Sequence, residues 1–163
     1  MTVRMGGVIN YQGSRPKLGA REWNKIKRTA GQEMAQHFFD HMLAIRFTVE
    51  GGRKLNYGKR SPATQRAKSR KKGHQNPLVW SGVSRKRAMA RLNSKTVSTS
   101  TTFRTDITLN TPALNLRNPK SNFTPSEEIR RVTAEEETEL QAVLQASIEK
   151  QLNNLQQQTS RKI

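Results

Sequence analysis

The segment from Gly51 to Lys95 contains fourteen Lys and Arg residues and no Asp or Glu. It supplies most of the formal net charge of +18 that the chain has at pH 7. A large charge of one sign governs association rather than fold, so this segment predicts an anionic partner, either a polyanion or an oppositely charged protein. A solvated face with ion-pair partners is the alternative, but a run of this length without a carboxylate is unusual for such a face.

Local signals inside this basic segment predict a short helix from Pro62 to about Lys72. Ser61 is a typical N-cap, proline suits the first helical position, and Gly73 suits a left-handed C-cap. The two alanines of the helix lie one turn apart, so we expect them to face the body of the protein. The remaining surface is basic and is predicted to bind the anionic partner through Arg66, Lys68, Arg70, Lys71 and Lys72.

A second basic cluster follows a short apolar run. Asn76 and Pro77 end the preceding element, because proline disfavours the helical region for the residue before it. The run Leu78–Trp80 is then expected to anchor the basic segment to a core. Beyond this run we expect three further cations to bind nucleic acid or another anionic partner, namely Arg85, Lys86 and Arg87.

The spacing of residues across this part of the chain resembles a known protein family. The matching positions are Phe47, Glu50, Gly51, Tyr57, Arg60, Ser61, Thr64, Lys68, Gly73, His74, Pro77, Leu78, Val79, Trp80, Ser81 and Gly82. They are similar to the pattern of small tail-completion and neck proteins of tailed bacteriophages, the phage virion morphogenesis or head–tail joining family. The resemblance covers roughly Glu22 to Leu152 and rests on structural motifs. The charge of residues 66–72 and 85–91 exceeds the usual pattern of the family.

The resemblance implies an α+β fold with an N-terminal helix, a central antiparallel β-sheet and a C-terminal helix, to which the residues themselves add the short basic helix. It implies a structural virion protein, a tail-completion or head–tail joining subunit. Its homo-oligomeric ring would connect head and portal to tail and surround the DNA path. The expected partners are further copies of the chain, other neck, portal-adaptor and tail proteins, and genomic DNA. The expected location is the virion, after assembly in the host cytoplasm.

A second function, from another class, stays open beside this one. The same basic segment would suit a freestanding protein that binds nucleic acid through its phosphates without reading bases. The chain lacks zinc-finger spacing, a basic region with a zipper, and the aromatic pattern of common RNA-binding domains. Sequence-specific recognition is therefore not expected.

Composition limits the domain organisation. With 33% hydrophobic residues the chain is lean for a self-sufficient globule, so we expect part of the burial to come from neighbouring subunits. The absence of Cys excludes disulfides and Cys-based metal sites. No segment has the apolar length of a signal peptide or a membrane span. We expect a soluble protein with a flexible arm at residues 1–19, a single α+β domain at 20–155 and a polar tail at 156–163.

Apolar periodicity predicts two long helices. From Ala20, apolar residues recur every three or four positions, which predicts a helix that ends near Ala44. A capping box of Thr133 and Glu136 predicts the start of another helix, which is expected to end near Asn154. The apolar faces consist of Trp23, Ile26, Ala30, Met34, Phe38, Met42 and Ile45 in the first helix, and of Leu140, Leu144, Ile148 and Leu152 in the second.

Acidic residues gather at the start of this second helix, where the helix dipole favours negative charge. Residues 127–163 contain seven acids and five bases, in contrast to the basic segment. A head-to-tail ring brings different surfaces of identical subunits together, so one chain can provide both halves of a complementary contact. We therefore predict a subunit interface in which Glu135, Glu136 and Glu137 approach the basic segment of a neighbouring subunit or of an adjacent ring.

Strand signals are strongest from Val97 to Leu109, where alternation predicts one half-buried antiparallel strand. Weaker patterns indicate brief strands at residues 8–11, 85–92 and 113–116, and a strand or extended segment at 46–50. We interpret Gly51 and Gly52 as a turn and residues 120–125 as a loop. The expected core includes Trp80, Phe103, Leu109, Leu144 and Ile148.

No constellation of residues predicts catalysis. His37 and His41 are four residues apart with Asp40 beside them, but a zinc site needs a third ligand, and the glutamate of the zincin pattern is absent. His74 has no nucleophile with an orienting partner, so we expect it to form hydrogen bonds at a helix end. We expect a protein that is not an enzyme and that needs no metal or cofactor.

Overall fold

A computed structural model describes residues 2–7, 18–79, 82–98, 103–109, 111 and 124–160. The chain divides into two compact units. We call the first the basic unit, which consists of Met1–Val3, Phe39–Asn93 and Thr108–Thr133. The second, the sheet unit, consists of Arg4–Phe38, Ser94–Ile107 and Ala134–Ile163. Helices at the N-terminus, in the middle and at the C-terminus accompany a small antiparallel sheet, which confirms the predicted α+β class.

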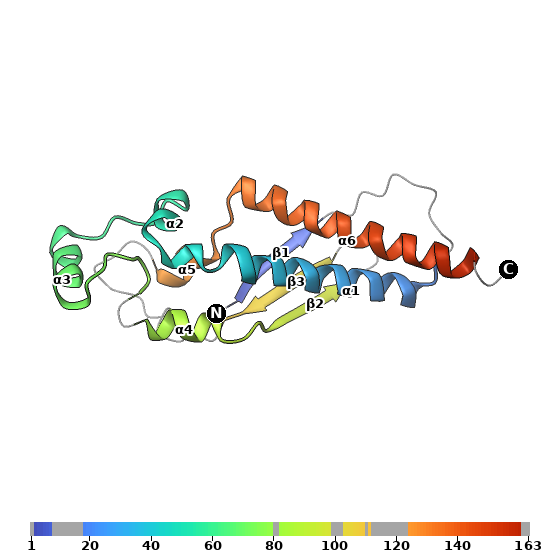
Figure 1. Ribbon diagram of the computed structural model, residues 1–163, viewed down its shortest axis with the longest axis horizontal. Coiled ribbons are helices and arrows are strands. Elements are labelled where there is room, and N and C mark those ends of the chain that lie inside the picture. Colours follow the sequence, from blue (N-terminus) through green and yellow to red (C-terminus); the bar gives the residue numbers. More distant parts are fainter. Residues whose placement is uncertain are drawn as a thin grey trace. The chain divides into compact units, whose positions relative to one another are not determined.

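The sheet unit pairs two long helices with three strands (Figure 1). Helix α1 (Ala20–His37) packs against both α6 (Ala134–Ser160) and strand β2 (Ser94–Ser98). The predicted apolar faces are buried at Ile26, Ala30, Met34, Leu140, Leu144, Ile148 and Leu152, whereas Trp23 is half-buried. Helix α6 begins as predicted and continues six residues beyond the expected end at Asn154.

The sheet has the order β1-β3-β2, with β1 at Thr2–Gly7 and β3 at Phe103–Thr108. Strands β2 and β3 pair antiparallel from Ser94↔Ile107 to Ser98↔Phe103. The prediction of one continuous strand from Val97 to Leu109 is therefore wrong. The sequence misleads because residues 99–102 are Ser and Thr, so no Gly, Pro or Asn marks a break in the alternation.

The antiparallel pairing also moves Val97 to the opposite face. Because Val97 pairs with Arg104, odd positions of β2 share a face with even positions of β3. Val97 is consequently 40% exposed, while Thr105 and Ile107 are fully buried. A change of register by one residue exchanges the two faces of a strand, and alternation alone does not reveal it.

Strand β1 lies within the segment expected to be an arm. Its residues Val3 and Met5 are buried, and β3 is its neighbour in the sheet. The brief strands predicted at residues 8–11 and 113–116 fall outside the described residues, as do Trp80 and the side chain of Phe103. Leu109, Leu144 and Ile148 of the predicted core are buried.

The basic unit is built from short helices. After the π-helix η1 (Phe38–Met42) come the 3-10 helix η2 (Ile45–Phe47), α2 (Val49–Lys54), α3 (Pro62–Lys72), α4 (Val83–Met89) and α5 (Pro125–Arg130). The π-helix explains why Ile45 is 44% exposed although the apolar pattern placed it on the buried face. A wider turn shifts the later side chains around the helix, so Leu43, which the pattern did not place on the apolar face, is buried, while Met42 is buried as predicted.

Two segments of this unit for which strand or extended structure was predicted, residues 46–50 and 85–92, are largely helical instead. Residues 46–50 comprise the end of η2, the N-cap Thr48 and the start of α2. The Thr48 hydroxyl accepts a hydrogen bond from the Gly51 N–H at 3.0 Å. Gly51 is thus a helical residue rather than part of a turn, and a Cβ there would lie 1.9 Å from the carbonyl oxygen of Ile45. Residues 83–89 form α4, in which Ala88 packs into the core of the unit. Helix α5 was not predicted, and its first residue, Pro125, was assigned to a loop.

Candidate polyanion-binding surface

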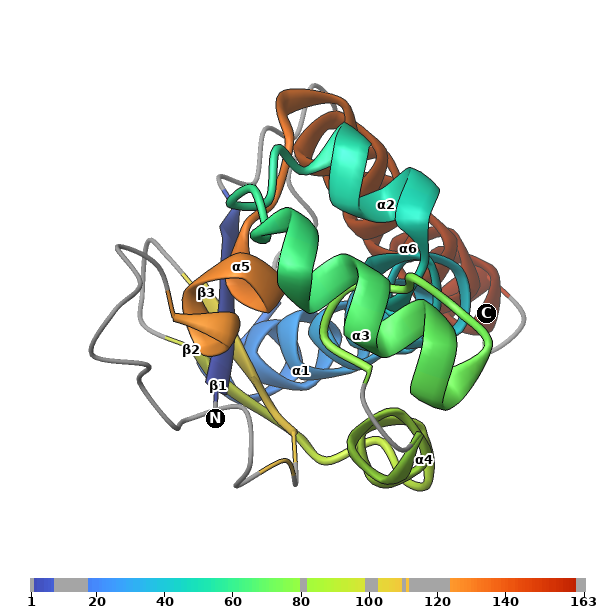
Figure 2. The same ribbon diagram turned by 90° about the vertical axis from the view of Figure 1, so that its left-hand side faces the viewer.

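Helix α3 is an exposed basic helix whose bounds and caps are those predicted. The Ser61 hydroxyl accepts the Thr64 N–H at 3.2 Å, and Gly73, with φ of 69°, donates its N–H to the Ser69 carbonyl at 2.9 Å. No residue of α3 is fully buried: of the two alanines expected to face the body, Ala63 is exposed and Ala67 is half-buried. Figures 1 and 2 show α3 as the outermost helix of the basic unit.

The charges of α3 repel one another. Arg66 and Arg70 lie one turn apart, as do Lys68 and Lys72, and α3 contains no acidic residue. Like charges four residues apart destabilise a helix by a few tenths of a kcal/mol per pair. An isolated helix of this length is also marginal in water. An anion bound along α3 would relieve this repulsion and stabilise the helix.

Lys68 differs from the other predicted binding residues. Its ammonium donates to the carbonyl oxygen of Asn76, which ties α3 to the segment that follows it. Burial lowers the pKa of Lys68, and the positive charge of Arg60 lowers it further. Lys68 thus has a structural contact inside the unit, whereas Arg66, Arg70 and Lys71 are exposed.

A buried carboxylate fixes the start of α3. Glu128 of α5 is fully buried and accepts hydrogen bonds from both terminal nitrogens of Arg60, at 2.9 and 2.6 Å. It also accepts the backbone N–H of Gly58 at 2.8 Å. A bidentate arginine pair gives geometric specificity as well as energy. Because Arg60 directly precedes the N-cap of α3, this contact positions the basic helix.

A second buried charge joins α5 to the end of η1. Arg46 is fully buried and donates to the carbonyl oxygens of Met42 at 2.9 Å, Ile129 at 3.1 Å and Arg131 at 2.9 Å. Arg131 in turn donates to the carbonyl of Asn56 at 2.6 Å. The bonds from Arg46 to Ile129 and Arg131 join segments that are 83 and 85 positions apart in the sequence.

Sequence reasoning missed Arg46, Glu128 and α5. The start of α5 had a readable signal, since Thr124 and Glu127 form a capping box around Pro125 at the first helical position. Arg46 and Glu128 had no local signal. Their partners are distant in the chain, and a single charged residue within a helical pattern reads as solvent-exposed.

The second basic cluster lies on α4. Arg85, Lys86 and Arg87 are all exposed, and Gly82 precedes the helix with φ of 80°. Across the segment from Gly51 to Lys95, twelve of the fourteen Lys and Arg residues are exposed, and the other two are the half-buried Arg60 and Lys68. Most charges of the basic segment are thus exposed to solvent rather than held in buried ion pairs.

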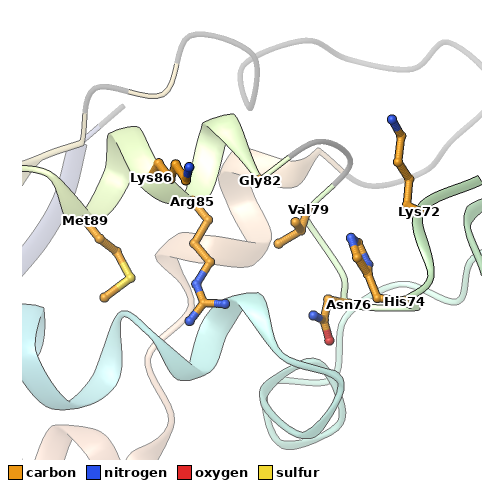
Figure 3. Close-up of a pocket in the computed structure, with 8 residues that line it drawn as sticks. All are labelled: Lys72, His74, Asn76, Val79, Gly82, Arg85, Lys86 and Met89. Carbon is orange, nitrogen blue, oxygen red and sulfur yellow. The ribbon is translucent and has the colours of Figure 1, made fainter.

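The end of α3, the segment after it and α4 line a pocket of 620 Å³ (Figure 3). Among the described residues, the lining consists of Lys72, His74, Asn76, Val79, Gly82, Arg85, Lys86 and Met89, which include four basic or imidazole side chains and no carboxylate. Val79 is buried and Met89 half-buried, so they give the pocket an apolar floor. The Nδ1 atom of His74 is buried without a hydrogen-bond partner, which differs from the hydrogen-bonding role expected for this residue.

The predicted acidic interface belongs to the sheet unit. Glu135 and Glu137 are exposed, but Glu136 is only 7% exposed and therefore does not offer its carboxylate to a neighbouring subunit. Further along α6, Glu139 lies 2.7 Å from the Nε2 atom of His37 on α1. No group of three potential metal ligands occurs among the described residues.

Comparisons with protein-family models, with curated proteins and with solved structures found no match to this chain. Among the described residues, none of the helices has the length and apolar character needed to cross a membrane.

Proposed function

We propose that the protein is a non-enzymatic structural subunit of the neck of a tailed bacteriophage. In this proposal it is a tail-completion or head–tail joining protein whose ring connects head and portal to tail around the DNA path. Two lines of support combine here. The residues from Phe47 to Gly82 resemble that family, and in the basic segment, which overlaps them from Gly51 onward, twelve of the fourteen Lys and Arg side chains are exposed.

The exposed basic surface is the observation that supports this function most strongly. Its twelve exposed cations are accompanied by no acidic residue between Gly51 and Lys95, so its field is not cancelled locally. Arg and Lys side chains that meet phosphates provide affinity without sequence information. A protein that surrounds a passing genome needs contact of this kind, because it meets every sequence in turn.

The proposed DNA contact is tested by its salt dependence. We expect binding of two unrelated duplexes with equal affinity, and a steep fall in affinity as salt rises, with a slope of about −0.9 per phosphate contacted. A variant with Arg66, Arg70 and Lys71 changed to Gln should have a slope shallower by about three units. A strong preference for one duplex, or no binding at low salt, would contradict the proposed contact.

Assembly state separates the neck function from the alternative. Sedimentation and negative-stain microscopy of the purified protein should show closed rings if it is a neck subunit. A freestanding nucleic-acid-binding protein, which the same basic surface also favours, should stay monomeric while it binds DNA. A monomer that shifts DNA strongly would therefore replace the first proposal with the second.

A further inference from the structure

The pocket beside α4 is the feature that the general basic surface does not explain. Most cations of the basic segment are solvated, but here several nitrogen donors line one concave site. Arg85 contributes a planar guanidinium, Asn76 an amide and His74 an imidazole. In Figure 3, Arg85 and Met89 extend from α4, while His74 and Asn76 lie on the other side of the hollow.

The chemistry of the lining selects for an oxyanion. Lys72, Arg85 and Lys86 are cationic, and the pocket lining contains no carboxylate that would balance them. The planar guanidinium can donate two parallel hydrogen bonds to two oxygens of a phosphate or carboxylate, and a monatomic anion cannot accept such a pair.

The size and floor of the pocket indicate more than a bare anion. A volume of 620 Å³ falls in the range typical of sites for organic ligands. Val79 and Met89 form an apolar floor next to the donors, which suits a sugar or another organic group attached to the anion.

We propose that this pocket binds the phosphate group of a phosphate ester, with Arg85 as the phosphate donor and with Val79 and Met89 against the organic part. The proposal rests on the proposed function in one respect, since it identifies the natural ester as a backbone phosphate of DNA. A free nucleotide offers the same chemistry, and the experiments below distinguish the two sources.

The first experiment compares two variants that lose the same charge. Arg85→Gln removes a pocket donor, whereas Arg28→Gln removes an exposed cation of α1, which lies outside the basic segment and does not line the pocket. Binding of a labelled 12-base-pair duplex is measured by fluorescence anisotropy. Loss of a charge-assisted hydrogen bond should weaken binding roughly tenfold for Arg85→Gln, and Arg28→Gln should change it by less than about threefold. Equal losses in the two variants would overturn the pocket proposal and leave the general DNA contact intact.

The second experiment uses small probes and reads the pocket directly. Thymidine 5′-monophosphate and inorganic phosphate are titrated separately while the ring signals of His74 are followed by NMR. We expect saturable shifts, with the nucleotide binding more tightly than inorganic phosphate because the floor contacts its organic part. Loss of nucleotide binding in Arg85→Gln but not in Arg28→Gln would support the site, and equal, non-saturating shifts with both probes would contradict it.

The two sources of phosphate give different combined results. If the duplex competes with the nucleotide for the pocket, the natural ligand is a backbone phosphate, as proposed. If the nucleotide binds in an Arg85-dependent manner and the duplex does not compete, the pocket remains a phosphate-ester site, but its identification with DNA is wrong. If no duplex binds to the wild-type protein while the nucleotide does, the DNA contact of the proposed function fails and the pocket stands.

Discussion

Gly31 of α1 lies so close to Thr105 of β3 that a Cβ atom at position 31 would be 2.5 Å from the Thr105 hydroxyl oxygen. The same Cβ would be 2.6 Å from the Thr96 hydroxyl, which itself lies 3.1 Å from that of Thr105. Glycine in the middle of a helix normally costs stability relative to alanine. Here it allows α1 to pack directly on a cross-strand threonine pair, and thereby sets the spacing between helix and sheet.

Replacing Gly31 by Ala should therefore destabilise the protein despite the better helix propensity of alanine. We expect the free energy of unfolding to fall by about 1–3 kcal/mol, as is typical of overpacked cores. Chemical denaturation measures this change. The double variant Gly31→Ala with Thr105→Ala should be more stable than the sum of the two single effects predicts, because removal of the Thr105 hydroxyl relieves one of the close contacts, while the one with Thr96 remains. Strict additivity would contradict the proposed contact.

Leu144 tests the packing of α6. It is fully buried, whereas the adjacent Val143 is half-buried. Leu144→Ala should lower the free energy of unfolding by about 2–5 kcal/mol, because it leaves a cavity in the core. Val143→Ala is the matched control and should cost clearly less. Equal denaturation midpoints for Leu144→Ala and the wild type would show that this face of α6 is not packed.

Glu128 should control the segment that leads into α3. In Glu128→Gln the guanidinium of Arg60 loses its charge partner, so we expect a loss of about 1–3 kcal/mol, less than for a fully buried pair because Arg60 is 25% exposed. Hydrogen exchange of the Gly58 amide, which bonds to Glu128, should accelerate selectively. Glu127→Gln is the control, since Glu127 is exposed and glutamine can still cap α5. Equal exchange rates in the two variants would contradict this role.

Lys68 should make stability depend on alkaline pH. Its folded-state pKa is lowered below the usual value of 10.5, so between the two pKa values the unfolded chain binds more protons than the folded one. Stability from this group therefore rises as pH increases toward 10.5. Relative to Lys68→Met, the wild type should gain stability between pH 8 and 10.5, as measured by denaturation at several pH values. A difference that is constant across this range would show that the ammonium is solvated in the folded protein.

Charge reversal at the start of α6 tests subunit pairing within the proposed ring. Since Glu136 is buried, the variant changes the exposed Glu135 and Glu137 to Lys. Ring formation at low salt should weaken while the melting temperature stays within a few degrees, because exposed charges contribute little to stability. The control changes Glu33 and Glu149 to Lys, which alters the net charge equally at other exposed positions. Equal ring formation by both variants would indicate that apolar contacts close the ring.

The elements that the sequence predicted well are those that local interactions specify. Helix α3 has the expected bounds because its signals, Ser61 and Gly73, act within one turn of its ends. The row of leucines in α6 identified its buried face, since the helical period is fixed by backbone geometry. The exposed basic surface was also predictable, because fourteen cations without carboxylates have too high a desolvation cost to be buried.

Contacts between distant segments decided the features that the sequence did not predict. The chain alternates equally well as one strand or two, and only pairing with β3 placed Val97 on the exposed face. Arg46 and Glu128 became buried because their partners come from segments roughly seventy to eighty-five positions away, which no local pattern records. The pocket likewise needed α3 and α4 to be brought together around His74 and Arg85. Local propensity fixes where a helix starts and ends, but burial and strand pairing depend on the whole folded chain. Tertiary contacts therefore decided the positions of the charged side chains that hold α3 and that line the pocket.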